Sequence, residues 1–596
     1  MRTVYTIALM LLFSAVTAAA APDLEAGFGA PPREARTRCF WWWLNGNVTQ
    51  EAITRDLEEM AAKGYGGALL FDASSSAHRT VERVPAGPMY GTPEWRLLFK
   101  HAVEEAARLG LVLSLNIQSG WNLGGPLVTH EEAAKQITWS ETSVDGPAAA
   151  GLKLPAPEAR DGFYRDIAVA AYRNKPQQRA AGAPALTASS EQAAHRAVNA
   201  VDGDPGTFWV SDGIEAGDGP TRDDPEWLEL AFAAPVEVGG VEVLGRHGYG
   251  PRMCELEADS ERVARFDVKN NQAAAEHFDT VSATTFRLRM TGAYDPRSPD
   301  APRNVQVAEW VLLDADGEAA AGMRRGRPIE DLRLKAAFRE LGGSAPDCRP
   351  LLEGLPGRPG EAHAQPADIL DLTDKLSEDG RLDWDAPEGT WTVLRFGYTI
   401  TGAKVSTSSG AWQGLVLDYM STPVFDAYWA RNVQPLLDDI GPLAGKSLRF
   451  LHTDSWECGG MNWTPGFADE FRARRGYDIL PYLPVFAGKI IENRDASNRF
   501  LADFRKTIAE CVADNHYAHF AERAHAHNLK VHPESGGPHA GPFDGIENLG
   551  LADMPMGEFW VASPHRPNPE NRFFVKQAAS VAHIYGKQRV AAAHGK

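Results

Sequence analysis

Apolar and amphipathic segments alternate along the first 140 residues. The chain runs strand, helix, strand, helix, strand, with apolar runs at residues 37–46, 67–73 and 111–117. Between the first two runs, Ile53, Leu57 and Met60 recur at helical spacing behind Thr49, a suitable N-cap. Strands that are apolar on both faces and alternate with amphipathic helices predict a parallel sheet with covered faces, either doubly wound or closed into a (β/α)₈ barrel.

The alternation stops near residue 140. Residues 141–395 carry short strand-like runs, many prolines and turn dipeptides, which predict an inserted β-sandwich region. Within it, about residues 180–315 resemble a galactose-binding-like sandwich in an acid-glycine turn and in the spacing of Trp209 and Trp227. These two rings could stack on a sugar, but we interpret them as core residues.

The parallel pattern resumes in residues 396–596. Amphipathic helices there separate strand-like runs at residues 447–457, 529–535 and 552–560, and a further run begins at residue 587. Together with residues 22–140 this predicts an α/β fold, a (β/α)₈ barrel interrupted by the insertion. Six strands and the opening of a seventh are present where a closed barrel needs eight, so we expect the barrel to be C-terminally incomplete.

Composition narrows the class of protein. The 596 residues include 79 acidic and 60 basic ones, a formal net charge of −19, with no basic run that would suit a nucleic acid. Residues 1–21 begin with a basic residue, continue with an apolar run and end in small residues, which is the order typical of a signal peptide. This predicts a periplasmic or secreted protein with no membrane span in the mature chain. Five scattered cysteines without a CxxC pair exclude a thiolate zinc site but allow one or two disulfides.

Candidate chemistry gathers where the predicted strands end. Because functional side chains of such a barrel lie at the carboxyl ends of its strands, we expect them to share one rim. The residues at these ends are Trp43 and Asn45; Asp72; Asn116, Gln118, Trp121 and Asn122; Asp454, Trp456, Glu457, Asn462 and Trp463; His532 and Glu534; and Glu558 and Trp560. An acid at a strand end is more often a solvated group. Acids beside Trp, Pro or Gly at three successive strand ends, however, are typical of a glycosidase cleft.

Six ordered motifs carry a family resemblance. They are "CFWWWLNGNVTQEAITRDLEEMAAKGYGG", "SGWNLGGP", "HTDSWECGGMNWTPGFADEFRARRGYDILPYLP", "HPESGG", "ADMPMGEFW" and "KQAASVAHIYGK". Over residues 35–140 and 410–590 the chain resembles glycoside hydrolase family 106, the α-L-rhamnosidases. The resemblance implies a (β/α)₈ barrel and an inverting hydrolysis of terminal α-L-rhamnosides. It also implies a calcium ion that helps to hold the sugar, in a rhamnose-containing oligosaccharide, polysaccharide or simple rhamnoside.

The resemblance also implies roles for the acids. Glu457 is the expected general acid, with Trp456 and Trp463 supplying the desolvation that raises its pKa. Glu558 is the candidate base, with Glu534 as its alternate. Glu534, Glu558 and Asp454 are candidate oxygen ligands of calcium.

Alternatives remain beside this hypothesis. A related glycosidase of different sugar specificity fits the same rim, although a uronidase needs an Arg or Lys, and the rim motifs are poor in both. A non-catalytic carbohydrate-binding protein is the non-enzyme alternative. Ala593 stands where the resemblance leads us to expect a further glutamate. We therefore expect the chain as given to be an incomplete, inactive catalytic unit if that glutamate is the base; Glu558 is then a metal ligand or substrate-binding residue.

Overall fold

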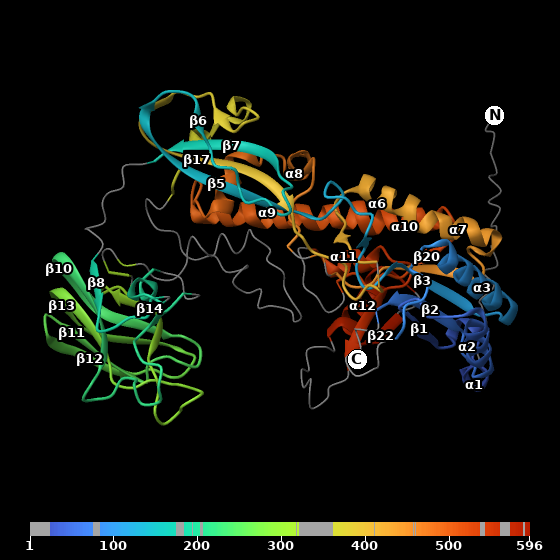
Figure 1. Ribbon diagram of the computed structural model, residues 1–596, viewed down its shortest axis with the longest axis horizontal. Coiled ribbons are helices and arrows are strands. Elements are labelled where there is room, and N and C mark those ends of the chain that lie inside the picture. Colours follow the sequence, from blue (N-terminus) through green and yellow to red (C-terminus); the bar gives the residue numbers. More distant parts are fainter. Residues whose placement is uncertain are drawn as a thin grey trace, which may run out of the picture.

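The protein has a mixed α/β fold built from several separate sheets (Figure 1). The computed structural model describes residues 24–74, 84–174, 184–193, 195–202, 207–317, 319–320, 323, 362–410, 412–456, 458, 460–536, 543–560, 573–587 and 591–595. The predicted signal peptide, residues 1–21, lies outside these ranges.

A parallel sheet of five strands combines segments from both ends of the chain. Its order is β1-β2-β3-β19-β20, with β1 (Arg38–Leu44), β2 (Gly67–Ala73), β3 (Val112–Ser119), β19 (Leu448–His452) and β20 (Lys530–Val531). Helices α2 (Gln50–Ala62) and α3 (Pro93–Leu109) connect its first three strands. The strands predicted in residues 37–117 are therefore confirmed. Those predicted at residues 447–457 and 529–535 are present but shorter, at Leu448–His452 and Lys530–Val531.

Capping residues set the ends of these two helices. Thr49 Oγ1 accepts a hydrogen bond from Ala52 N at 3.2 Å at the start of α2, as predicted. Thr92 and Pro93 open α3, and Gly110 ends it in the left-handed conformation that glycine adopts without steric cost.

The second half of the chain is mainly helical. Its helices are α6 (Thr422–Tyr428), α7 (Gln434–Ile440), α8 (Phe467–Arg475), α9 (Arg494–Val512), α10 (His519–His525), α11 (Gly545–Gly550) and α12 (Phe573–Ile584). One π-helical turn (Trp429–Val433) joins α6 to α7 and another (Ala513–Ala518) joins α9 to α10. The segment from α6 to α7 and the segment from α9 to α10 are thus each one continuous helical rod with an inserted π turn.

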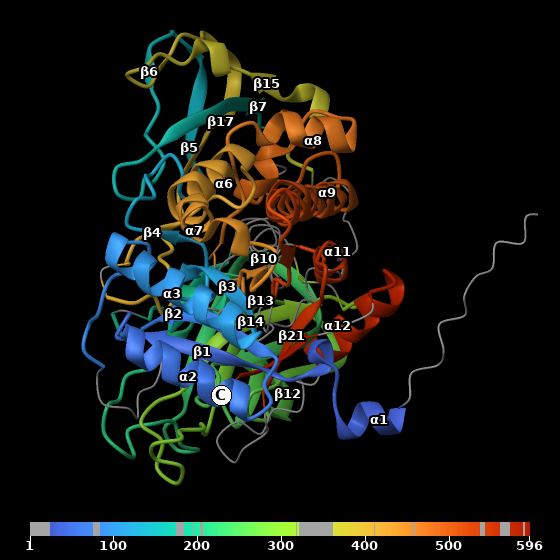
Figure 2. The same ribbon diagram turned by 90° about the vertical axis from the view of Figure 1, so that its right-hand side faces the viewer.

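A four-stranded antiparallel sheet brackets the insertion. Its order is β15-β7-β17-β5, with β5 (Lys135–Ala148), β7 (Arg165–Arg173), β15 (Leu370–Asp371) and β17 (Ala386–Ile400). β5 and β17 pair from Lys135 with Ile400 to Ala148 with Ala386, so the chain leaves and re-enters through adjacent strands. Helices α8 and α9 lie beside this sheet in both ribbon views (Figure 2).

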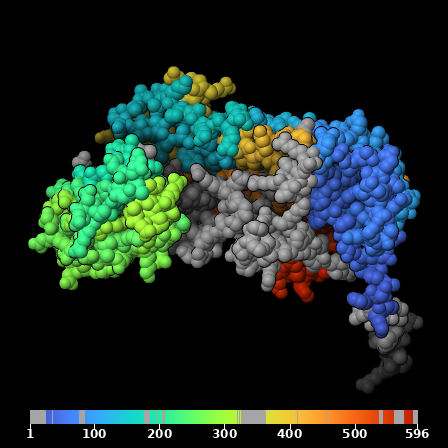
Figure 3. All heavy atoms as spheres, turned by 60° about the horizontal axis from the view of Figure 1, so that its bottom comes forward, coloured from blue at the N-terminus to red at the C-terminus, as the bar shows by residue number. Residues whose placement is uncertain are grey.

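The rest of the insertion forms a lobe with its own core (Figure 3). Its seven-stranded antiparallel sheet comprises β8 (Ala185–Ala188), β9 (Trp209–Val210), β10 (Glu226–Gly245), β11 (Met253–Ala258), β12 (Glu261–Asp267), β13 (Ala273–Met290) and β14 (Gln306–Leu313). Trp209 is fully buried there, as expected of a core residue. Trp227, which was also expected to be a core residue, is only partly buried, and the guanidinium of Arg287 lies 4.6 Å above its ring.

Shorter elements complete the description. β21 (Met556–Trp560) and β22 (Ala591–Gly595) form a parallel pair in which Glu558 lies opposite Ala593. The other α-helix and strands of the described chain are α1 (Leu24–Gly29), β4 (Gly124–Gly125), β18 (Leu415–Val416), β6 (Leu152–Lys153) and β16 (Arg381–Leu382). The described strands form no closed sheet.

Two further properties concern the whole described chain. None of its helices is both long enough and apolar enough to cross a bilayer. No disulfide joins its four cysteines, Cys39, Cys254, Cys458 and Cys511.

Candidate functional site

The two faces of the parallel sheet differ in what covers them. On one face, Trp41 Nε1 donates to Asp56 of α2 at 3.3 Å, and the Trp43 ring lies 5.4 Å from that of Trp95 in α3. Side chains alternate along a strand, so Phe40 and Trp42 point to the opposite face. We call this opposite face the inner face; its residues are Phe40, Trp42, Phe71, Asn116, Gln118, Phe450, His452 and His532.

Aromatic rings form a wall on the inner face. The Phe71 ring lies 5.8 Å from Trp42, 5.8 Å from Trp121 and 5.3 Å from His452. Trp42 and Trp121 meet edge to face at 5.3 Å, and both are partly exposed. Rings held in this way present apolar surface against which the C–H face of a sugar can stack.

Two amide oxygens at the end of β3 are buried without a partner. Asn116 Nδ2 donates to the carbonyls of Gln118 at 3.2 Å and Gly120 at 2.9 Å. Gln118 Nε2 donates to the carbonyl of Trp121. Within the described chain Asn116 Oδ1 and Gln118 Oε1 then have no donor. An unpaired buried acceptor costs about 1–3 kcal/mol, which a ligand hydroxyl would recover.

Two histidines from adjacent strands face each other next to this wall. His452 Nδ1 lies 2.7 Å from the carbonyl oxygen of His532, so this nitrogen donates. Burial, and then the neighbouring His452, lower the pKa of His532 well below its usual value, which keeps that ring neutral. His532 Nε2 is buried and has no partner among the described residues, which suits the predicted role in binding a hydroxyl.

Three carboxylates stand at the ends of successive strands on this side. Asp454 Oδ1 accepts from Ser455 N at 2.8 Å and Oδ2 lies 3.4 Å from His452 Nε2, leaving the side chain 14% exposed. Glu534 is 4% exposed, and its backbone N–H donates to Thr453 O at 3.0 Å. On β21, Met556 packs in one cluster with Leu69 and Phe71, so the half-buried Glu558, two positions further on, points to the same side.

Two predicted site residues lie outside this description. Glu457, the expected acid, is not among the described residues, and the same holds for the side chain of Trp560. The neighbours of Glu457 along the chain, Trp456 and Cys458, are both buried.

Trp43 and Asp72 lie on the helix-covered face, and this position does not fit the substrate contact predicted for them. Both are fully buried and oppose each other in the register of β1 and β2. Asp72 accepts hydrogen bonds from Ser119 Oγ at 2.5 Å, Trp95 Nε1 at 3.1 Å and Ser409 Oγ. Burial raises the pKa of Asp72 to about 6 despite these three donors. Through these hydrogen bonds, Asp72 connects β2 to β3, to α3 and to the loop that contains Ser409.

The predicted asparagines hold loop backbones. Asn45 Nδ2 donates to Val84 O at 2.8 Å. Asn122 Oδ1 accepts from Ser406 N, and Asn462 Oδ1 from Ile137 N, both at 2.8 Å. These asparagines position the loops around the inner face.

The tryptophans on either side of Glu457 are packing residues. The Trp456 ring lies between Tyr419, at 5.2 Å, and Phe543, at 5.0 Å. Trp463 packs against Phe467 at 5.1 Å. Trp42 contributes ring surface on the inner face instead, although its neighbour Trp43 was the residue selected from the sequence.

A fully buried ion pair anchors the loop that follows Glu457. Lys135 Nζ lies 3.3 Å from Asp418 Oδ2 and donates to the carbonyls of Glu131 at 2.8 Å and Ala133 at 2.7 Å. Thr464 Oγ1 donates to Asp418 Oδ2 at 2.7 Å. Asn462 N donates to Lys135 O at 3.0 Å, and Asn462 Oδ1 accepts from Ile137 N at 2.8 Å, so the loop is tied to β5 at two points.

The inner face does not by itself complete a metal site. No three His, Cys, Asp or Glu side chains of the described chain are grouped as metal ligands. Carboxylate and amide oxygens, the donors that calcium prefers, are nevertheless those present at the ends of β3, β19 and β21.

Comparisons with known proteins agree with a carbohydrate-active site. The family described as alpha-L-rhamnosidase, Glyco_hydro_106, matches residues 29–594. The solved structure of a rhamnosidase from Novosphingobium sp. PP1Y is 29% identical, with a TM-score of 0.66, over 96% of this chain and 53% of that one.

A curated protein of Formosa agariphila named "Putative beta-glucuronidase" is 28% identical over 573 residues, which are 96% of this chain and 35% of that protein. The chain therefore spans about a third of the length of the Formosa agariphila protein and about half of the length of the Novosphingobium rhamnosidase.

Proposed function

Since the chain belongs to the α-L-rhamnosidase family of glycosidases, glycoside hydrolase family 106, we propose that it releases terminal α-L-rhamnose from a rhamnose-containing glycan or rhamnoside. The proposal includes export, a (β/α)₈ barrel built on the parallel sheet and an inserted galactose-binding-like sandwich built on the seven-stranded sheet.

The inner face is the observation that carries the proposal. It combines the partly exposed rings of Trp42 and Trp121 with the unpaired oxygens of Asn116 and Gln118. A sugar supplies the complement of both, because its C–H faces stack on rings and its hydroxyls donate hydrogen bonds. Carboxylates at the ends of the neighbouring strands add groups that can transfer protons.

We assign the catalytic roles by family resemblance. Glu457 protonates the leaving oxygen, and Glu558, or Glu534 in its place, takes a proton from the attacking water. An inverting pair stands about 6.5–9.5 Å apart so that a water molecule fits between acid and sugar.

Calcium is part of the proposal on the same ground. Glu534, Glu558 and Asp454 would be its carboxylate ligands, and the ion would help to orient the sugar hydroxyls. No step of the mechanism is routed through it, since the described residues alone form no complete ligand set.

The name of the Formosa agariphila relative makes a β-glucuronidase the second candidate. A uronic acid needs a cation beside its carboxylate. Arg38 lies at the amino end of β1, next to the inner face, where its guanidinium lies 4.6 Å over Phe450 and donates to Ser114 Oγ. Arg38 thus lies at the end of the strand opposite to the carboxylates. Among the described residues it is not placed to pair with a sugar carboxylate, which favours a rhamnoside over a glucuronide.

The test is a panel of aryl glycosides with the purified chain. We expect aryl α-L-rhamnoside to be hydrolysed and aryl β-glucuronide and α-L-fucoside to be left intact, with release of β-rhamnose as first product, seen by NMR. Hydrolysis of the glucuronide alone would replace the proposal by the second candidate. Rhamnoside binding without turnover would support either a carbohydrate-binding protein or an incomplete catalytic unit in which Glu558 is not the base.

A further inference from the structure

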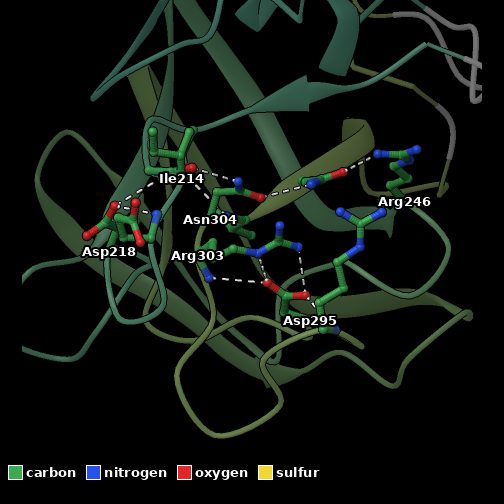
Figure 4. Close-up of polar contacts among 12 residues, drawn as sticks. Ile214, Asp218, Arg246, Asp295, Arg303 and Asn304 are labelled. Atoms are coloured by element: carbon green, nitrogen blue, oxygen red, sulfur yellow. Dashed lines mark hydrogen bonds and ion pairs between the residues drawn. The ribbon is translucent and has the colours of Figure 1, made fainter.

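The lobe of seven strands carries a row of hydrogen bonds that ends at its surface. Asn304 Nδ2 donates to Gly213 O at 2.9 Å, and Gln306 Nε2 donates to Asn304 Oδ1 at 2.8 Å. Arg246 Nη1 then donates to Gln306 Oε1 at 2.7 Å (Figure 4). Both amides of the row are buried, so the orientation of the last donor is set from inside the lobe.

Aromatic rings also pack against the guanidinium of Arg246. Its guanidinium carbon lies 4.1 Å from the centre of the Phe208 ring and 5.2 Å from that of Tyr249. The Phe208 ring stacks in turn on His195, at 4.4 Å and 18°. An exposed arginine is therefore held on a ring stack, which removes most of the rotamer entropy that a free side chain loses on binding.

Arg246 has no acidic partner within the described part of the chain. A neighbouring arginine shows the alternative: Arg303 donates from Nε and Nη2 to the two oxygens of Asp295 at 2.7 and 3.0 Å. Arg246 uses one of its five N–H donors on a neutral amide. Its remaining edge matches the forked geometry of a carboxylate.

The lobe that carries Arg246 is acidic as a whole, with 25 acidic and 11 basic residues between positions 184 and 320. At physiological salt, charges more than about 8 Å away are largely screened. Recognition of an anion would therefore depend on the short-range geometry of Arg246 and not on the field of the lobe.

We propose that Arg246, with Phe208 and Tyr249 beside it, binds the carboxylate of a uronic acid unit in a glycan. The forked guanidinium takes the carboxylate and the ring edges contact the sugar. The residues belong to the seven-stranded lobe and none lies on the inner face. Binding is thus independent of hydrolysis and would hold the enzyme on an acidic polysaccharide.

The test measures binding of the full chain to oligogalacturonate by isothermal titration calorimetry. We compare Arg246→Gln and Arg246→Lys with Arg262→Gln, which removes the same charge from the edge strand β12 of the same lobe. We expect Arg246→Gln to weaken binding at least tenfold and Arg246→Lys at least threefold, because lysine keeps the charge but not the fork. Arg262→Gln should bind like the wild type.

Two further measurements decide what is recognised. Methyl-esterified oligogalacturonate should bind at least tenfold more weakly, and dextran sulfate should show no loss of binding specific to Arg246→Gln. Equal binding of the ester, equal losses in Arg246→Gln and Arg262→Gln, or no binding of oligogalacturonate by the wild type would each overturn the proposal. Hydrolysis of aryl rhamnoside should be the same in Arg246→Gln and wild type, so a failed hydrolase assay leaves this test intact.

Discussion

Replacing Lys135 with methionine should destabilise the fold and misplace the loop that follows Glu457. Methionine keeps the length and most of the volume of lysine, so the change removes a charge rather than a packing group. Asp418 is then a buried carboxylate whose remaining donors are Thr464 Oγ1 at 2.7 Å and Met420 N at 3.0 Å. Removing one partner of a buried ion pair costs about 3–5 kcal/mol, because the other charge stays buried.

Urea unfolding followed by tryptophan fluorescence, and kcat on an aryl rhamnoside, measure the two effects. The midpoint should fall by the equivalent of about 3–5 kcal/mol in Lys135→Met, and Lys135→Met/Asp418→Asn should recover part of the loss. Lys489→Met is the matched control, since the pair of Lys489 with Glu141 is partly exposed and should contribute about 1 kcal/mol or less. Equal midpoints for Lys135→Met and Lys489→Met, or no recovery in the double variant, would refute the reasoning.

Four other predictions concern activity and pH. Trp121→Ala should raise KM or lower kcat for a rhamnoside with little change in stability. Trp43→Ala should instead lower the unfolding free energy by about 3–5 kcal/mol. Equal effects of the two variants on activity and stability would contradict the assignment of Trp121 to the inner face and of Trp43 to the helix-covered face. Glu457→Gln should lower kcat about 10²–10⁴-fold for a poor leaving group and much less for a good one; equal losses would show that Glu457 is not the acid. Chelation should suppress activity and calcium, rather than zinc, restore it, and full activity in a metal-free sample would end the calcium hypothesis. Burial raises the pKa of Asp72 to about 6, so the stability that the protonated Asp72 contributes is full below about pH 4 and is lost as pH rises through 6. The unfolding free energy of the wild type should therefore fall by on the order of 3 kcal/mol more than that of Asp72→Asn between pH 4 and 7. Parallel curves of stability against pH for the two proteins would contradict this.

The order of strands and helices was predictable because it depends on local patterns. Apolar runs and capping residues such as Thr49 are recognised from neighbours a few positions away in the sequence. The π turns were not predictable in this way. One inserted residue barely changes the helical spacing of apolar positions on either side of it.

The facing of individual side chains was harder to predict. Residues 40–43 are four aromatic residues in succession, so apolar alternation cannot tell which pair points inward. Trp43 and Asp72 lie opposite each other in the parallel pairing of β1 and β2. Predicting that Trp43 faces the site instead of Trp42 therefore also places Asp72 on the wrong face. The three donors to Asp72 come from positions 95, 119 and 409, and no local signal connects them.

The pairing of β3 with β19 has a consequence for how the protein is made. Leu113 pairs with Leu448, roughly 335 residues later, so β3 leaves the ribosome long before its neighbour exists. At about 5–20 residues per second the wait is roughly 15–70 s, during which an apolar strand edge is open to wrong partners. The pairing of β5 with β17 can form before β19 pairs with β3. Once Lys135 and Ile400 are adjacent, the translated insertion no longer separates the two halves, and β19 needs to find only a nearby edge. The ladder that frames the insertion can thus act as a folding checkpoint, and pulse proteolysis of stalled nascent chains ending just before or just after residue 400 would reveal it.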